Sequence, residues 1–262
     1  MTILDQIAEK TRARVEALKA ADSPESIRRQ AMEAEKRERN VFYEAVASEG
    51  VRLICEVKKA SPSKGVIDPV FDYLRIAADY EAAGGDCISC LTEPDWFLGS
   101  EDIFRDIRSR VRLPMLQKDF VVDDYQIYRA KVLRADCVLL IAALMNTKTL
   151  AERLEICERL RLAALVETHD EDEIASALSA GARMIGVNSR NLKDFSVDLT
   201  QALRLRDRIP PGVLYVSESG VRTPEDAAVI RRAGADAILI GEALMRAQDR
   251  QAALQALKEA VT

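Results

Sequence analysis

Short apolar runs alternate with helical patterns of roughly 10 to 15 residues along most of the chain. The first run, residues 51–55, leads into Glu56-Val57-Lys58 and then into Ser, Pro and Gly residues typical of a turn, so it predicts a buried strand. Seven further runs predict strands at residues 86–91, 113–116, 136–141, 162–166, 183–187, 212–216 and 236–240. Strands that alternate with helices indicate parallel pairing, with the helices packed against the sheet.

The predicted helix-to-strand joints repeat one another. Three joints read Ala83-Gly84-Gly85-Asp86, Ala180-Gly181-Ala182-Arg183 and Ala233-Gly234-Ala235-Asp236, and Arg134-Ala135-Asp136 is a variant without glycine. Glycine is the expected C-cap of a helix. Eight such units in about 215 residues match a (β/α)8 TIM barrel, which takes as few as 200 residues. A doubly wound open sheet is the alternative, but the strands are short and evenly spaced, and no GxGxxG follows the first.

Residues 1–48 precede the first strand and predict a helical extension. Apolar residues recur at Ile3, Leu4, Ile7, Val15 and Leu18, and Ser-Pro-Glu at residues 23–25 starts a second helix, expected over residues 27–48 with a solvated charged stretch at 33–39. The extension is too small for an independent domain. We therefore expect one domain, residues 1–262, in which residues 1–48 cap a mouth of the barrel.

Composition limits the partners and the compartment. The net charge is -5 and basic residues are interleaved with acidic ones, which argues against nucleic-acid binding. The first 20 residues lack the apolar core of a secretory signal, and no apolar run reaches the ~18 residues of a membrane span. Five cysteines without a disulfide pattern suit a reducing compartment. We expect a cytoplasmic protein with no membrane or obligate protein partner.

Two other chemistry-bearing features favour structural roles. Cys87 and Cys90 match CxxC, but residues i and i+3 of a strand face opposite ways, and no second motif completes a metal set. His169, the single histidine, stands where a helix begins, so a surface or capping role is expected rather than a Ser-His-Asp triad. We expect no metal site.

Charged and polar residues follow the predicted strands. In a barrel of this kind, catalytic residues lie at the carboxyl ends of the strands. The exits carry Glu56 and Lys58, Thr92-Glu93, Gln117-Lys118-Asp119-Phe120, Glu167, Asn188-Ser189-Arg190-Asn191 and Ser217-Glu218-Ser219-Gly220. A desolvated lysine beside a carboxylate is a way to obtain a shifted proton affinity, so Lys118 is a candidate general acid.

Two loops predict a phosphate site. Ser219-Gly220-Val221 and Gly241-Glu242-Ala243 follow the seventh and eighth strands, where barrels of this fold frequently bind phosphate through backbone N–H groups. Lys58, Lys64 and Lys118 would supply positive charge despite the acidic total. A phosphorylated small molecule is therefore the expected ligand.

The same motifs resemble those of the indole-3-glycerol phosphate synthase family. The resemblance covers essentially the whole chain and includes Glu56-Val57-Lys58 with Ser61-Pro62-Ser63, Leu91-Thr92-Glu93 with Phe97, Lys118-Asp119-Phe120, Val166-Glu167, Gly186-Val187-Asn188-Ser189-Arg190-Asn191-Leu192, Ser217-Glu218-Ser219-Gly220 and Leu239-Ile240-Gly241. It implies closure of 1-(2-carboxyphenylamino)-1-deoxyribulose 5-phosphate to indole-3-glycerol phosphate in tryptophan biosynthesis, with loss of carbon dioxide and water and without a cofactor.

The resemblance also implies residue roles. Lys118 would be the general acid for ring closure, Glu167 would take part in dehydration with assistance from Lys58, Glu56 would orient the lysines, and the extension would meet the substrate carboxylate. The implied catalytic residues are Lys118, Glu167, Lys58, Glu56, Asn188 and Ser219. The implied binding residues are Lys58, Ser61, Glu218, Ser219, Gly220, Gly241, Glu242 and Arg190, with Phe97, Phe120 and Leu139 as an apolar wall.

Three positions, Cys90, Trp96 and Gln117, depart from the commonest family pattern and bear on the shape of the aromatic pocket. Two rival functions are a retaining glycosidase, which would use Glu56, Glu167 and Glu218 as paired carboxylates, and a non-catalytic binder of sugar phosphates. The phosphate loops and the lysines argue against a neutral sugar. Loss of turnover in Lys118→Ala would distinguish the synthase from the binder.

Overall fold

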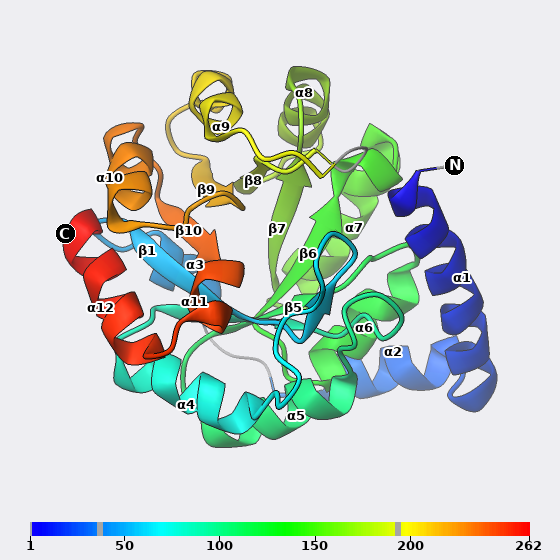
Figure 1. Ribbon diagram of the computed structural model, residues 1–262. Coiled ribbons are helices and arrows are strands. Elements are labelled where there is room, and N and C mark those ends of the chain that lie inside the picture. Colours follow the sequence, from blue (N-terminus) through cyan, green and yellow to red (C-terminus); the bar gives the residue numbers. More distant parts are fainter. Residues whose placement is uncertain (1, 36–38, 192–194) are drawn as a thin grey trace.

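The strands form a closed parallel barrel, with helices arranged around it (Figure 1). The structure is a computed structural model and describes residues 2–35, 39–191 and 195–262. The barrel strands are β1 (Arg52–Val57), β4 (Cys87–Leu91), β5 (Met115–Lys118), β6 (Cys137–Ile141), β7 (Ala163–Thr168), β8 (Met184–Asn188), β9 (Leu214–Glu218) and β10 (Ala237–Ile240). The circle closes because β1 pairs with both β4 and β10, so the predicted (β/α)8 barrel is confirmed and the open sheet is excluded.

Helices follow the strands, one after each, on the outside of the barrel. They are α4 (Tyr73–Ala82), α5 (Glu101–Arg110), α6 (Asp124–Val132), α7 (Thr147–Arg159), α8 (Glu171–Ser179), α9 (Leu199–Arg206), α10 (Pro224–Arg232) and α12 (Arg250–Val261). Three small additions follow strands β1, β6 and β10: the hairpin β2 (Ala60–Ser61) with β3 (Gly65–Val66), the 3-10 turn η1 (Ala142–Leu144) and α11 (Glu242–Arg246). The additions therefore stand at the carboxyl ends of the strands.

The repeated joints are helix C-caps. Gly84, Gly181 and Gly234 have φ angles of 78°, 89° and 77°, in the left-handed region that ends a helix most readily with glycine. Arg134, in the joint without glycine, takes the same conformation with a φ of 64°. One backbone geometry therefore serves all four joints.

Alternation along the strands divides the buried side chains into two sets. Leu53, Cys55 and Val57 of β1 face outward into the layer between strands and helices, whereas Ile54 belongs to the inner cluster. The inner cluster also contains Cys87, Leu116, Cys137, Leu139, Ile141, Ala163, Leu165, Met184, Val216, Ala237 and Leu239. Cys90 lies in the outer set, so Cys87 and Cys90 face opposite ways as predicted. All five cysteines are free and buried.

The extension forms three helices: α1 (Ile3–Ala21), α2 (Pro24–Glu33) and α3 (Val41–Val46). The single helix predicted over residues 27–48 is wrong, because α2 ends at Glu33 and Asn40 caps a new helix through the amide of Tyr43. Part of the predicted charged stretch, residues 36–38, lies outside the described residues. The interrupting segment is mostly charged and offers few apolar side chains to bury.

Different parts of the extension reach opposite ends of the barrel. Phe42 and Val46 of α3 join the inner cluster, and the Arg183 guanidinium, just before β8, lies 4.5 Å from the Tyr43 ring centroid. These contacts place α3 at the amino ends of the strands. α1 and α2 lie along the outside of the barrel beside α6, as Figure 1 shows at its right-hand side. Within the described ranges, no helix is long and apolar enough to cross a membrane.

Candidate active site

Charged side chains replace the apolar ones at the carboxyl end of the barrel interior. Glu56, Lys118, Glu167 and Glu218 each stand two residues after a member of the inner apolar cluster and therefore point into the barrel. The four strands that carry them, β1, β5, β7 and β9, each run two residues further than the sequence predicted, so these groups lie in the last positions of strands and not in loops. Their positions are therefore set by the strand ladders.

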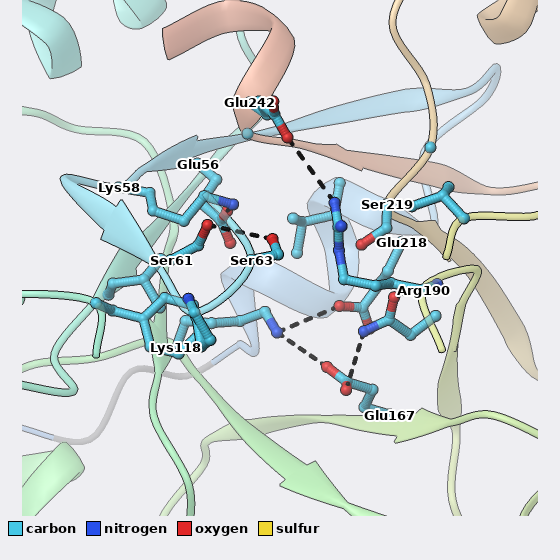
Figure 2. Close-up of a pocket in the computed structure, with 18 of the residues that line it drawn as sticks. Glu56, Lys58, Ser61, Ser63, Lys118, Glu167, Arg190, Glu218, Ser219 and Glu242 are labelled. Atoms are coloured by element: carbon cyan, nitrogen blue, oxygen red, sulfur yellow. Dashed lines mark hydrogen bonds and ion pairs between the residues drawn. The ribbon is translucent and has the colours of Figure 1, made fainter. Parts of the chain in front are cut away.

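Lys118 lies between two carboxylates (Figure 2). Its Nζ atom is 2.9 Å from Glu167 Oε2 and 3.4 Å from Glu218 Oε2. The side chains of Lys118, Glu167 and Glu218 are 14%, 4% and 2% exposed, so the charges interact with little screening from water. The adjacent Asp119 has other partners, Arg14 and Thr92.

The proton affinities in this cluster move apart. Burial lowers the pKa of Lys118, but the charges of Glu167, Glu218 and Glu56 outweigh it and hold that pKa above its usual value. Burial likewise raises the pKa of Glu167, and the nearby Lys118 and His169 bring it well below the usual range. Burial raises the pKa of Glu218 to about 8, reinforced by the charge of Glu167. One carboxylate is thus firmly ionised and the other close to neutral.

A second ion pair stands beside this cluster. Lys58 Nζ lies 2.5 Å from Glu56 Oε1, and their side chains are 16% and 6% exposed. The Asn188 amide donates to Glu167 Oε1 at 3.1 Å, and its carbonyl accepts from the Arg190 amide at 3.0 Å. Each predicted catalytic carboxylate therefore has a fixed polar neighbour.

Two inward-facing positions are glycines because carboxylates occupy the space beside them. A Cβ at Gly186 would lie 2.0 Å from Glu218 Oε1. A Cβ at Gly241 would lie 2.4 Å from Glu56 Oε1 and 3.0 Å from Lys58 Nζ. Any larger residue would displace these charged groups.

A cavity of about 320 Å³ opens above the charged layer. All the catalytic and binding residues that the family resemblance implied line it: Glu56, Lys58, Ser61, Phe97, Lys118, Phe120, Leu139, Glu167, Asn188, Arg190, Glu218, Ser219, Gly220, Gly241 and Glu242. Phe97 and Phe120 form an apolar wall, with ring centroids 6.0 Å apart. Lys64 is not one of the lining residues and lies 4.0 Å from Glu242. The cavity thus combines an apolar wall with a strongly charged floor.

The loops after β9 and β10 form another side of the cavity. Ser219 has a φ of 65°, a conformation that a non-glycine residue adopts at some cost, and Gly220 follows with 95°. No side chain caps the start of α11 in the described structure. The Glu242 carboxylate lies 3.9 Å from Arg190 and 3.1 Å from Arg246, so cations gather here around one acidic group.

Sequence reasoning missed two contributions to this region. Ile3, Leu4 and Ile7 of α1 line the cavity, and these three side chains are apolar, which does not support the expected contact with a substrate carboxylate. The His169 ring, expected at the surface or in a cap, is mostly buried beside Glu167. The sequence signal for this position was that His169 directly follows the end of the strand that carries Glu167.

The departures from the family pattern lie away from the cavity. Cys90 faces the outer layer, Gln117 donates to Thr92 at 3.2 Å, and Trp96 is not one of the lining residues. None of the three side chains is part of the aromatic wall.

The fold and the site are those of a (β/α)8 barrel with buried acidic and basic side chains at the carboxyl ends of its strands. A sequence model of the family "Indole-3-glycerol phosphate synthase" matches residues 4–257. The chain therefore belongs to the indole-3-glycerol phosphate synthase family, carboxy-lyases of tryptophan biosynthesis.

Individual relatives agree with this assignment. The chain is 50% identical to indole-3-glycerol phosphate synthase of Ruminiclostridium cellulolyticum, over 98% of each chain, and 42% identical to that of Lachnoclostridium phytofermentans, also over 98% of each. A crystal structure of 3-hexulose-6-phosphate synthase matches with a TM-score of 0.66 at 16% identity, covering 81% of this chain and all of that one. At that identity the likeness shows the fold alone.

Proposed function

We propose that this protein converts 1-(2-carboxyphenylamino)-1-deoxyribulose 5-phosphate to indole-3-glycerol phosphate with the residues that line the cavity. Family membership supports the reaction. The observation that carries the mechanism is the buried Lys118 ammonium, held by Glu167 and Glu218 between the apolar wall and the glycine loops. A retaining glycosidase is disfavoured, because both carboxylates bind the same lysine.

Lys118 acts as the general acid in ring closure. As the ring carbon that bears the carboxylate attacks the ketone carbon, the Lys118 ammonium donates a proton to the ketone oxygen. The carboxylate then leaves as carbon dioxide, and its electron pair restores aromaticity. A raised pKa keeps Lys118 protonated at neutral pH, so the acid is present in each turnover.

Dehydration needs a second acid and a base. The new hydroxyl takes one proton and leaves as water, and the ring-closed intermediate loses one proton. These two transfers cancel, so the proton that Lys118 donates in ring closure is the one that a full turnover takes up from solvent. Glu167 and Lys58 carry out these transfers, and Glu56 holds Lys58 in place. Asn188 positions Glu167, and because an amide has two N–H donors it can also hold a substrate hydroxyl.

The phosphate binds where the β9 and β10 loops meet. The backbone amides of Ser219, Gly220, Gly241 and Glu242 face it, and Lys58 supplies charge. Ser61 and Arg190 contact the substrate near the rim, while Glu218 contacts it at the floor. Phe97, Phe120 and Leu139 enclose the aromatic ring, and the α1 side chains close the cavity over it.

We also propose the following organisation. Residues 1–262 form one domain, and residues 1–48 cap the barrel, supported by the α3 contacts at one end and the α1 contacts at the other.

The reaction needs no metal or cofactor, because recovered aromaticity drives decarboxylation and side chains move the protons. Five free cysteines suit the reducing cytoplasm. A phosphorylated small molecule is the expected partner, without nucleic acid, a membrane or an obligate protein.

Indole fluorescence tests this function. Purified protein mixed with the substrate, without added metal, should produce a growing indole signal. Lys118→Ala should lower kcat at least 10³-fold yet keep most of the affinity for the phosphorylated product, measured by calorimetry. Tight product binding with no turnover by the unaltered protein would indicate a sugar-phosphate binder instead.

A further inference from the structure

The single histidine of the chain lies between two carboxylates outside the cavity. His169 Nε2 is 3.5 Å from Glu167 Oε1, and Nδ1 is 3.2 Å from Glu173 Oε2. The backbone amide of His169 donates to the same Glu173 oxygen at 2.8 Å, and Gln201 donates to the His169 carbonyl at 2.5 Å. The His169 side chain is 16% exposed, so these contacts hold the ring in one orientation.

The Nε2 atom is the unusual feature. It is buried, faces Glu167, and has no hydrogen-bond partner among the residues that the structure describes. An imidazolium carries an N–H on both ring nitrogens, whereas a neutral ring carries only one. A protonated His169 therefore donates its Nδ1–H to Glu173 and carries a second N–H, at Nε2, 3.5 Å from Glu167 Oε1, where the contact is an ion pair.

These groups form a continuous line from the surface to the general acid. Glu173, with a side chain 20% exposed, contacts His169; His169 faces Glu167; and Glu167 binds Lys118. Glu167 thus has cations on both oxygens, with Lys118 at Oε2 and His169 at Oε1. The Asn188 amide shares the Oε1 side.

We propose that His169, anchored by Glu173, is a positioning residue that keeps Glu167 ionised and oriented for the proton transfers of dehydration. The proposal rests on the function assigned above to Glu167. His169 does not touch the substrate cavity and acts only through Glu167. Glu173, in the first turn of α8, acts one step further out as the anchor.

The charges around His169 favour its protonated form. Glu167 of β7 and Glu173 of α8 contribute negative charge, and Glu218 of β9 adds to it in its ionised form. Lys118 of β5, beyond Glu167, opposes them. Burial lowers the pKa of His169, but the Glu173 hydrogen bond and these carboxylates outweigh it, so the pKa lies above its usual value. When His169 loses its proton, Glu167 loses a neighbouring cation and its own pKa rises.

Titration of the one histidine by NMR tests the coupling directly. Because no other histidine is present, the ring proton signals of an untagged sample report His169 alone. Glu167→Gln and Glu173→Gln should each lower the pKa of His169 by about one unit. Glu171→Gln is the matched control, because Glu171 lies in the same first turn but pairs with Arg208 at the surface. An unchanged pKa in Glu167→Gln would overturn the proposal.

Kinetics separates a positioning role from a structural one. His169→Gln keeps a polar side chain without the charge, so the acid limb of the kcat–pH profile should move up by about one unit while KM stays the same. His169→Ala should show the same shift and also a lower plateau. An unmoved acid limb in both folded variants would contradict the proposal. If the protein shows no synthase activity yet the NMR coupling persists, the assigned function fails and the His169–Glu167 coupling stands.

Discussion

The Lys118 ammonium lies 2.9 Å from the Glu167 carboxylate, although β6 stands between their strands in the barrel. The long lysine side chain crosses the interior to reach it. Glu218 approaches the same ammonium at 3.4 Å, so two carboxylates share one cation. The excess of negative charge keeps Lys118 protonated and makes Glu218 the group that gives up its charge most readily.

Glu218→Gln should stabilise the fold in alkaline solution. Glu218 Oε1 is buried without a partner in the described ranges, and the pKa of this carboxyl is raised to about 8. A raised pKa contributes stability that is complete below the unfolded value, near 4.5, and is lost as the pH rises through about 8. A neutral amide avoids that loss. The difference in the free energy of unfolding between the variant and the parent should therefore be roughly 1–2 kcal/mol more favourable to the variant at pH 9 than at pH 6.

Urea unfolding at the two pH values measures this difference. Glu225→Gln, at an exposed position of α10, makes the same change in net charge and should leave the pH dependence unaltered. Parallel stability curves for the parent and Glu218→Gln would show that Glu218 is ionised without penalty. Activity should fall in Glu218→Gln, because the Lys118 pair is weakened.

Gly186→Ala should damage the site through Glu218. The added methyl would lie 2.0 Å from Glu218 Oε1 and 3.2 Å from Leu165 Cδ1, so the carboxylate must move off Lys118. We expect kcat to fall at least tenfold and the free energy of unfolding to fall by about 1–3 kcal/mol. In Gly186→Ala/Glu218→Ala the clash is removed, so stability should return while activity stays low. A double variant no more stable than Gly186→Ala would exclude this clash as the cause.

The sequence predicted the barrel, and the gathering of the candidate site residues around one cavity, because both depend on strand periodicity. The ends of β1, β5, β7 and β9 each combine a local apolar run with a charged residue two positions beyond an inward-facing one, as in Ile54 and Glu56 or Leu165 and Glu167. Parallel strands then bring all carboxyl ends to one mouth. The barrel topology alone therefore predicts that residues distant in sequence, such as Lys58 and Gly241, lie close together.

Features set by tertiary contact were not predictable. The charged residues between α2 and α3 allow a break, but where α3 begins also depends on Phe42 and Val46, which join a buried cluster that the local sequence does not show. The inward face of α1 reads in the sequence as an ordinary amphipathic helix, and nothing local shows that it reaches the cavity. The orientation of the His169 ring likewise depends on its contacts with Glu167, near the end of the strand that leads into it, and with Glu173, one helical turn away.

Arg14→Met should loosen the extension and weaken substrate binding. Arg14 of α1 lies 2.6 Å from Asp119 Oδ1, a largely buried pair that also involves Thr92. Loss of Arg14 leaves the Asp119 charge partly unpaired, so the free energy of unfolding should fall by about 1–3 kcal/mol. KM should rise because α1 also carries apolar side chains of the cavity wall. Lys10→Met removes an exposed ion pair in which Lys10 Nζ lies 3.8 Å from Asp95 Oδ1, so it should change neither the free energy of unfolding nor KM measurably. Equal effects of the two changes would assign no docking role to Arg14.

Gly241→Ala should act on phosphate binding through Lys58. The methyl would lie 3.0 Å from Lys58 Nζ and 2.4 Å from Glu56 Oε1, which displaces the ion pair from the mouth of the β10 loop. KM for the substrate, and the inhibition constant of inorganic phosphate, should both rise about tenfold or more, with a smaller change in kcat.

Lys58→Met should raise the same constants. Because both changes act on one group, the double variant should bind phosphate no more weakly than the worse single variant. Fully additive losses would mean that Gly241 contributes through its own backbone amide, independently of Lys58.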